Sequence, residues 1–229
     1  MDIITLTDGN LLCLLQLASP ALPVGAYSYS EGLETLVENG AIAHQAALQH
    51  WLEAELRYGA IRLEAAVMVR TYQSVKMADF KALSYWNMWL SAARETEELR
   101  TSSWQMGRSL IQLLGKLETQ IMPIVNAVGN PCNYAIAFGI GAAHWDINIK
   151  AALLGYLHTW ASHMITAGVK LIPLGQTVGQ QLMRSLQGLL CDVVVEIMNL
   201  EDDELGCCSW GLSLASMMHE TQYTRLFRS

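Results

Sequence analysis

The chain has little charge. Lys, Arg, Asp and Glu make up 15% of its 229 residues, against about a quarter in an average globular protein. The 14 basic and 21 acidic residues give a formal net charge of −7. Because nucleic-acid binding depends on clustered Lys and Arg, the lack of a basic stripe argues against nucleic acid as the main ligand. Hydrophobic residues make up 52%, so the chain can bury a sizeable core, and we expect a partner to cover some apolar surface.

The sequence also lacks the features of a secreted or membrane protein. The number of cysteines is five, and Cys207 and Cys208 are adjacent, so we expect no disulfide framework and predict a cytoplasmic location. A membrane-spanning helix needs about 20 apolar residues. The four longest stretches without charge are interrupted by proline, asparagine, serine or histidine, so buried or interfacial helices are predicted in their place.

Motifs of common enzyme classes are missing. There is no Walker loop, no C-x-x-C, no H-E-x-x-H and no G-x-S-x-G, and Gly139-Ile-Gly141 lacks the final glycine of a dinucleotide fingerprint. We therefore predict no catalytic residues.

Metal ligands are also poorly placed. His158 and His163 are five residues apart, which is about 140° around a helix, so they do not share a face. Cys207, Cys208 and His219 could form a loose site for a soft metal ion, but a flexible acidic loop with idle thiols is the preferred interpretation. We predict no metal site.

Hydrophobic residues repeat with a helical period, most clearly over 99–117, and strand alternation is almost absent. Ser28 and Glu31 have the spacing of a capping box for a helix that ends at Asn39. Glycine and proline divide the rest into helices at roughly 9–17, 44–75 (with a break at Gly59), 79–92, 94–117, 119–128, 133–144, 149–171, 176–198 and 212–221. The prediction is an all-α, single-domain helical bundle of about nine or ten helices over residues 1–229, with 199–211 as a solvated acidic loop.

Four segments have compositions that suit contacts with a partner. In the first, Pro20 and Pro23 hold an extended turn, and Gly25 permits a backbone conformation that other residues resist. Ser28 can cap the next helix, and Tyr27 suits a half-buried contact. The alternative is a rigid loop between helices.

The second segment gathers charge in a chain that has little of it. Arg94 and Glu98 are four residues apart, and Glu97 and Arg100 are three apart, so both pairs can form along a helix face. Glu95 is the remaining residue of this segment predicted to bind a partner. The alternative is a solvated helix start.

The third segment is a corner formed by Pro173, Gly175 and Gln176. Proline ends one helix, and Gln176 could cap the next helix or contact a partner. The alternative is a plain helix–helix corner.

The fourth segment is the C-terminal tail, residues 219–229. Aromatic residues and arginine are enriched at binding hot spots. The alternative is a tail packed on its own domain. The tail residues predicted to bind a partner are His219, Glu220, Tyr223, Arg225, Leu226, Phe227 and Arg228.

Together these segments resemble the UreF family of urease accessory proteins. The resemblance covers nearly the whole chain and is carried by LLQLASPALPVGAYSYSEGLE (14–34), RETEELR (94–100), PLGQTVGQ (173–180) and HETQYTRLFRS (219–229).

The resemblance implies a non-enzymatic scaffold that matures urease. Such a protein binds UreD (UreH in some organisms) and recruits the GTPase UreG, and the assembly inserts nickel into apo-urease in a GTP-dependent step. It has no cofactor of its own, because nickel passes through the assembly and UreG binds the GTP. The family is all-α and dimerises. Helix 149–171, uncharged from 151 to 169, is then a candidate dimer face, with plain core as the alternative.

Two further functions remain open. In one, the chain is a GTPase-activating protein or fidelity regulator of UreG and supplies an arginine in trans, for which Arg94, Arg100, Arg225 and Arg228 are candidates. In the other, it is a metallochaperone that itself holds nickel. For the scaffold, the resemblance implies that the tail docks on UreD, with Arg225 as the first contact because of its forked donors.

Overall fold

The computed structural model describes residues 6–207 and 209–228, and these form an all-helical bundle without a strand, as predicted. Two of its α-helices, α2 and α7, have only six and seven residues. In chain order the elements are α1 (Asp8–Leu17), η1 (Ala26–Ser28), α2 (Leu33–Glu38), α3 (Gln45–Tyr58), α4 (Ala60–Lys76), α5 (Phe80–Ala93), α6 (Glu97–Leu117), η2 (Thr119–Ile121), α7 (Met122–Val128), α8 (Tyr134–His144), α9 (Ile149–Leu171), α10 (Gln176–Met198), η3 (Asp202–Glu204) and α11 (Trp210–His219).

Local sequence signals set most helix ends. The predicted break at Gly59 is confirmed, since α3 ends and α4 begins there. The side chains of Asp79, Thr96 and Asn148 each accept a hydrogen bond from a backbone N–H in the first turn of α5, α6 and α9. Such caps satisfy donors that a helix start leaves free.

The predicted capping box of Ser28 and Glu31 is wrong. Ser28 ends the short helix η1, and α2 starts at Leu33 after Gly32, whose φ is 84°. Glu31 itself has φ 52°, and its carboxylate accepts a hydrogen bond from the indole of Trp160 in α9. The tertiary contact therefore overrides the local capping signal.

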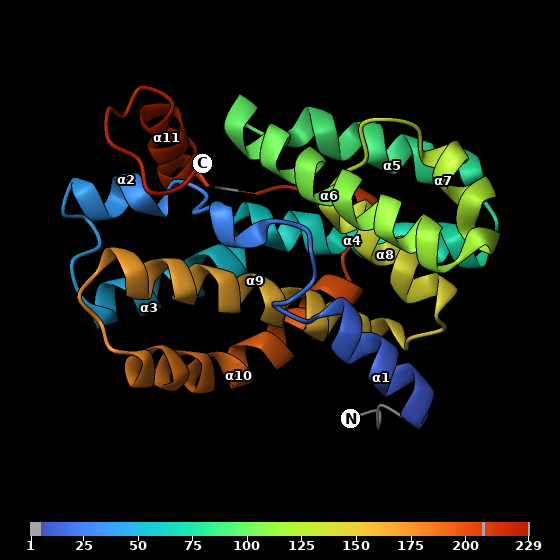
Figure 1. Cartoon of the computed structure of the whole chain (residues 1–229), viewed down its shortest axis with the longest axis horizontal. Coiled ribbons are helices and arrows are strands. Elements are labelled where there is room, and N and C mark those ends of the chain that lie inside the picture. The colour runs from blue at the N-terminus through green and yellow to red at the C-terminus, as the bar shows by residue number, and fades with distance from the viewer. Residues whose placement is uncertain (1–5, 208, 229) are drawn as a thin grey trace.

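Helix α9 runs through the middle of the molecule (Figure 1). It packs against α10, α4, α2, α8 and α1, while α5, α6 and α7 lie towards one end and α2, α3 and α11 towards the other. Its buried residues include Leu153, Tyr156 and Met164. Residues 149–171 are therefore mainly core, which is the alternative to the prediction, and the structure does not support this whole helix as the candidate dimer face.

Helix α6 comes close to the segment just before α8 at Gly107. A Cβ atom there would lie 2.1 Å from the carbonyl oxygen of Cys132. Next to this contact, Asn133 donates to Asn87 Oδ1 from both its backbone and its side chain, at 3.0 and 2.9 Å. The polar pair is fully enclosed, so its hydrogen bonds fix α5 against α8.

Two surface features complete the fold. Residues 201–204 of the predicted acidic loop are all exposed, and Asp202 forms an ion pair of 3.0 Å with Arg70. Within residues 6–207 and 209–228, no helix has both the length and the apolar character needed to cross a membrane.

Candidate partner-binding surface

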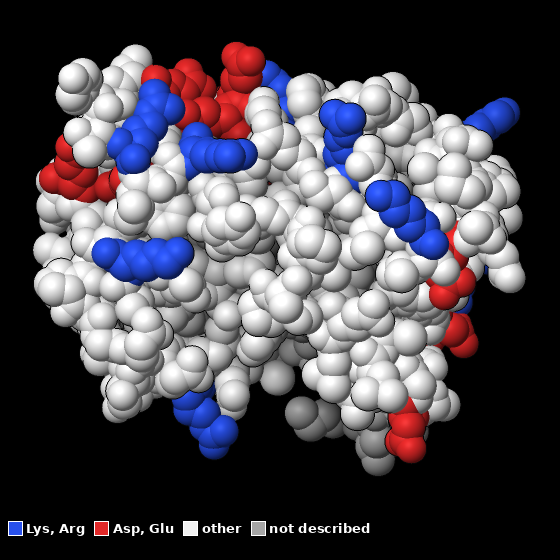
Figure 2. Space-filling model, viewed as in Figure 1, with Lys and Arg blue, Asp and Glu red and all other residues white. Residues whose placement is uncertain are grey.

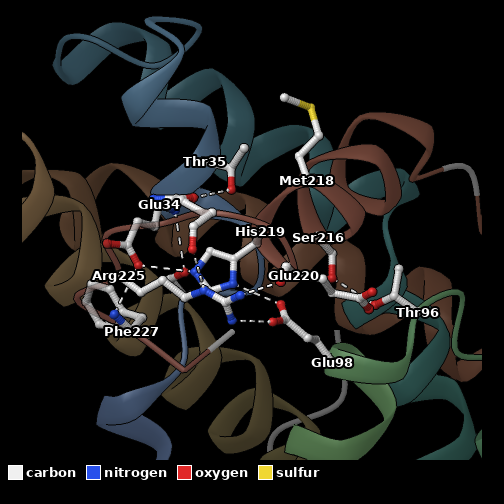
Figure 3. Close-up of polar contacts among 12 residues, drawn as sticks. Glu34, Thr35, Thr96, Glu98, Ser216, Met218, His219, Glu220, Arg225 and Phe227 are labelled. Carbon is white, nitrogen blue, oxygen red and sulfur yellow. Dashed lines mark hydrogen bonds and ion pairs between the residues drawn. The ribbon is translucent and has the colours of Figure 1, made fainter.

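After α11 the chain turns back and lies along α2, where Glu34 holds it (Figure 3). One carboxylate oxygen of Glu34 accepts from the backbone N–H of Leu226 at 2.6 Å, and the other accepts from that of Phe227 at 3.0 Å. Glu34 is buried. Hydrogen bonds to an ionised acceptor are among the stronger ones in proteins, so this carboxylate anchors the end of the tail.

His219, the last residue of α11, lies between two carboxylates. Its Nδ1 is 2.9 Å from Glu98 Oε2 in α6, and its Nε2 is 3.2 Å from Glu34 Oε2. The side chain is fully buried. His219 therefore joins α2, α6 and α11 from the inside and presents no surface of its own.

The guanidinium of Arg225 holds the tail in a turn through contacts with Glu98 and with two backbone carbonyl groups of the tail. Its Nη1 is 3.1 Å from Glu98 Oε1, its Nε donates to the carbonyl of Gln222 at 3.0 Å, and its Nη2 donates to the carbonyl of Glu220. About one third of the side chain stays exposed. Figure 3 shows Arg225 and His219 converging on Glu98.

The next residues attach the tail to two more elements. Phe227 is buried, and the ammonium group of Lys170 in α9 lies 5.6 Å from its ring centre. The backbone N–H of Arg228 donates to the carbonyl of Ser28 at 2.8 Å. Burial raises the pKa of Tyr29, and the nearby Arg228 opposes that rise.

Beside the tail lies a hollow of about 370 Å³ with a polar rim. Glu97, Glu98, Glu220 and Arg228 line it together with Tyr29, whose hydroxyl donates to Gln105. Three carboxylates and one guanidinium at one opening suit polar contacts with another protein more than burial of an apolar ligand.

Apolar side chains are exposed next to this polar framework. Tyr223 is fully exposed, and Leu226 is 65% exposed. Helix α11 adds a stripe of exposed apolar residues at helical spacing, which sequence reasoning missed although the spacing was visible. The stripe consists of Trp210, Leu214, Met217 and Met218.

The predicted proline loop meets the tail only in part. Pro20, Pro23 and Tyr27 are exposed, and Gly25 adopts φ 78°, as its conformational freedom predicts. Ser28 contacts the tail through its carbonyl group.

The corner of Pro173, Gly175 and Gln176 is exposed at the α9–α10 junction. Gly175 precedes the first residue of α10, Gln176. Gln176 and Pro20 line one cavity of about 260 Å³ between α9 and α10. The structure therefore brings these two predicted segments together, at a place separate from the tail contacts described above.

The ion pairs expected along residues 94–100 do not form. Arg94 precedes α6 and is buried, where it pairs with Glu64 of α4, and Glu98 pairs with the tail. Arg100 is half-buried, with its guanidinium carbon 5.7 Å from the ring centre of Trp104. Because its charge is enclosed, Arg94 is excluded as an arginine supplied to a partner.

The alternative soft-metal site of Cys207, Cys208 and His219 falls partly outside the described residues, because Cys208 is not among them. Cys207 donates from its thiol to Glu95 at 3.2 Å. Burial and Glu95 raise the pKa of Cys207 to about 12. Both nitrogens of His219 face carboxylates instead. Among the described residues, no group of three His, Cys, Asp or Glu is placed to hold a metal ion.

Sequence reasoning also missed Glu34, which organises the tail although it lies at the end of the first segment. Its role depends on contacts 192 and 193 residues away, to Leu226 and Phe227. Fold and site together are those of an all-α protein whose C-terminal segment is fixed by hydrogen bonds to the buried Glu34 and by the ion pair of Arg225 with Glu98, beneath exposed apolar side chains, as in a protein that binds other proteins.

Comparison with known proteins identifies the family. A family model described as UreF matches residues 42–187. Over the full length of both chains, the sequence is 74% identical to the urease accessory protein UreF of Nostoc sp. (strain PCC 7120) and 72% identical to that of Trichormus variabilis. It is 40% identical to that of Chromohalobacter salexigens, over 94% of this chain and 93% of that one. The chain belongs to the UreF family, which confirms the resemblance, and it is a urease accessory protein rather than a urease.

Proposed function

We propose that this chain is a non-enzymatic scaffold for urease maturation. It binds UreD (UreH) and recruits the GTPase UreG for GTP-dependent nickel insertion into apo-urease. Membership of the UreF family supports maturation as the process. Nickel and GTP are cargo and partner ligand in this proposal, and the chain carries no cofactor of its own.

One observation carries the choice of docking surface. The tail is anchored from below by Glu34 and Glu98, while Tyr223 and Leu226 point outwards without a role in the core. Exposed aromatic and aliphatic groups on a fixed backbone lose little conformational entropy on binding. We propose that UreD covers Tyr223, Leu226 and the adjoining stripe of α11.

The test is co-purification of the chain with UreD and UreG of the same host, analysed by size exclusion with mass detection. Deleting residues 219–229 would remove the buried His219 and Phe227. A loss of binding in that variant could then result from misfolding and not from the loss of a contact surface. A double variant Tyr223→Ala/Leu226→Ser changes only exposed side chains. We expect unchanged thermal stability and loss of the ternary complex.

The matched control is Tyr58→Ala, since Tyr58 is 64% exposed on α3. It should assemble normally. A full ternary complex with the double variant would refute the tail surface, and a failure of the unaltered chain to bind either folded partner would refute the scaffold itself. Arg225→Ala should also weaken assembly, with some loss of stability because Arg225 holds the tail.

A GTPase-activating or fidelity role for UreG is the second candidate. Arg228 favours it, because this residue is exposed and its backbone is fixed by Ser28. An arginine supplied in trans is worth about 10³–10⁵ in turnover. If Arg228→Ala leaves UreG turnover unchanged within an intact complex, this role is excluded for Arg228.

A homodimer in the cytoplasm remains part of the proposal. The chain has exposed apolar residues away from the tail, such as Leu12 and Leu15 of α1, which suit contact with a second copy. Mass measured over a dilution series tests the dimer, and a monomer at every concentration would contradict it.

A further inference from the structure

A small cavity of about 30 Å³ lies between the segment before α2 and helices α4, α6, α8 and α9. Its wall is mainly apolar but includes two carboxyl groups. The titratable or hydrogen-bonding side chains in this wall include Glu31, Glu64, Tyr134, Tyr156, Trp160 and His163. These six residues do not line the hollow beside the tail, whereas Tyr29 lines both.

Two carboxyl groups meet at this cavity. Glu31 is turned inwards from a left-handed backbone conformation, with φ 52°, and its Oε2 accepts from Trp160 Nε1 at 3.0 Å. Glu64 pairs with Arg94 through Oε1 and accepts from the Tyr156 hydroxyl through Oε2 at 2.7 Å. Each carboxylate oxygen has two lone pairs, so both groups retain capacity to accept another hydrogen bond.

Tyr134 supplies a donor that the protein itself does not use. The residue is only 7% exposed, and its hydroxyl has no hydrogen-bond partner among residues 6–207 and 209–228. A buried hydroxyl without a partner loses its solvation and gains nothing in return. The rings of Tyr134 and Tyr156 lie 5.8 Å apart, so Tyr134 is packed firmly in this position.

The size and chemistry of the cavity select the ligand. One water molecule needs about 10–15 Å³ measured with a water-sized probe, and two to four polar partners. At about 30 Å³ the cavity is too small for an organic ligand. The described residues hold no group of three His, Cys, Asp or Glu placed for a metal ion.

We propose that this cavity is a binding site for one ordered water molecule, which accepts a hydrogen bond from Tyr134 and donates to the carboxyl pair of Glu31 and Glu64. The water joins the segment before α2 to α4 and α8 through the core. It therefore holds the backbone conformation of Glu31 in place from the inside.

The surrounding charges agree with such a bridge. Glu31 is faced by Glu64 of α4, by Glu55 of α3 and by Arg94 and Glu95 before α6. Burial, and then the charge of Glu64, raise the pKa of Glu31 to about 7. Arg94 attracts the carboxylates of both Glu31 and Glu64. A water molecule between these two carboxyl groups separates their like charges and can hydrogen-bond to both, whether or not one of them carries a proton.

The test is a crystal structure of the full chain, collected so that anomalous scatterers are identified, for the unaltered protein and for Tyr134→Phe. We expect one density peak without anomalous signal, within hydrogen-bonding distance of Tyr134 Oη and of a carboxyl oxygen. The peak should be lost or displaced in Tyr134→Phe. Tyr156→Phe is the matched control, because the Tyr156 hydroxyl bonds directly to Glu64 and its loss should leave the water in place.

Three results would overturn the proposal. These are a peak with anomalous signal, a Tyr134 hydroxyl bonded directly to the protein with no peak, or a peak that is unchanged in Tyr134→Phe. Nuclear Overhauser transfer from a long-lived water to the Tyr134 ring gives a second readout in solution, which requires no variant. Its absence in the unaltered chain would also overturn the proposal.

Discussion

Gly107 controls how closely α6 and α8 approach. Gly107→Ala would place a methyl group 2.1 Å from a backbone carbonyl oxygen, which cannot move aside as a side chain can. Inserting a methyl group into a well-packed core costs about 1–3 kcal/mol, and more when backbone must shift. We expect the free energy of unfolding in urea to fall by at least this amount.

Gly188 provides the control for this substitution. It lies in α10, and a Cβ there meets no atom within 4 Å. Gly188→Ala should raise stability by about 0.5–1 kcal/mol, because alanine loses less backbone freedom in a helix. Equal effects of the two substitutions would contradict the close approach at Gly107.

Arg94 shows what sequence spacing cannot decide. Its distance from Glu98 along the chain suits a pair on a helix, but the helix starts three residues later, and Glu64 takes the guanidinium into the core. A buried arginine is stable only when it is paired. Its partner lies on another helix, 30 residues away, and no local pattern identifies it.

Among the elements, the tail depends most on single contacts. In Glu34→Gln, only one side-chain oxygen remains to accept hydrogen bonds, and the new amide group can only donate, so it cannot replace the second acceptor for Leu226 and Phe227. Hydrogen bonds to charged groups contribute about 1.5–3 kcal/mol. We expect faster proteolysis within residues 220–228 while the rest of the chain stays resistant.

Glu38→Gln is the control, because Glu38 is exposed at the end of the same helix. It should leave the rate of tail cleavage unchanged. A Glu34→Gln protein that is cut no faster than this control would show that Phe227 and Arg225 hold the tail without the carboxylate.

Elements bounded by glycine, proline or capping residues were predictable from the sequence. Helices α9 and α10 match the predicted ranges 149–171 and 176–198, and the gap between them contains Pro173 and Gly175. The start of α2 was not predictable, because the interior contact of Glu31 decides it. For the candidate site, the aromatic residues and arginines of the tail predicted a binding segment. The burial of His219 and the exposure of apolar side chains on α11 depend on how the helices pack, and so they could not be predicted from the sequence.

For the whole molecule, the buried acids predict how stability changes with pH. Burial raises the pKa values of Glu31 and Glu55 to about 7, from 4.5. The native state therefore holds protons that the unfolded chain releases. The contribution of these two groups to the free energy of unfolding is complete below about pH 4.5 and is lost as the pH rises to about 7. Each unit of pKa difference corresponds to about 1.4 kcal/mol.

His163 acts in the opposite direction. Burial lowers the pKa of His163 from 6.5 to about 4, so its contribution to the free energy of unfolding increases as the pH rises from about 4 to 6.5. We expect a net loss of stability between about pH 5 and 8, measured by urea unfolding, with its clearest slope just below pH 7. Glu31→Gln/Glu55→Gln should flatten that slope, and an unchanged slope would contradict the assignment.

The contacts of Glu34 also determine when during synthesis the tail can attach to α2. Glu34 leaves the ribosome early, but two of its partners are the backbone groups of Leu226 and Phe227, 192 and 193 residues later. Domains generally fold as units during synthesis, and this carboxylate obtains those two partners only once residues 226 and 227 have been synthesised. A chain that stops before residue 226 would keep the contact between Glu34 and His219 but would lack these two backbone donors, and so would differ from the unaltered chain at the tail surface.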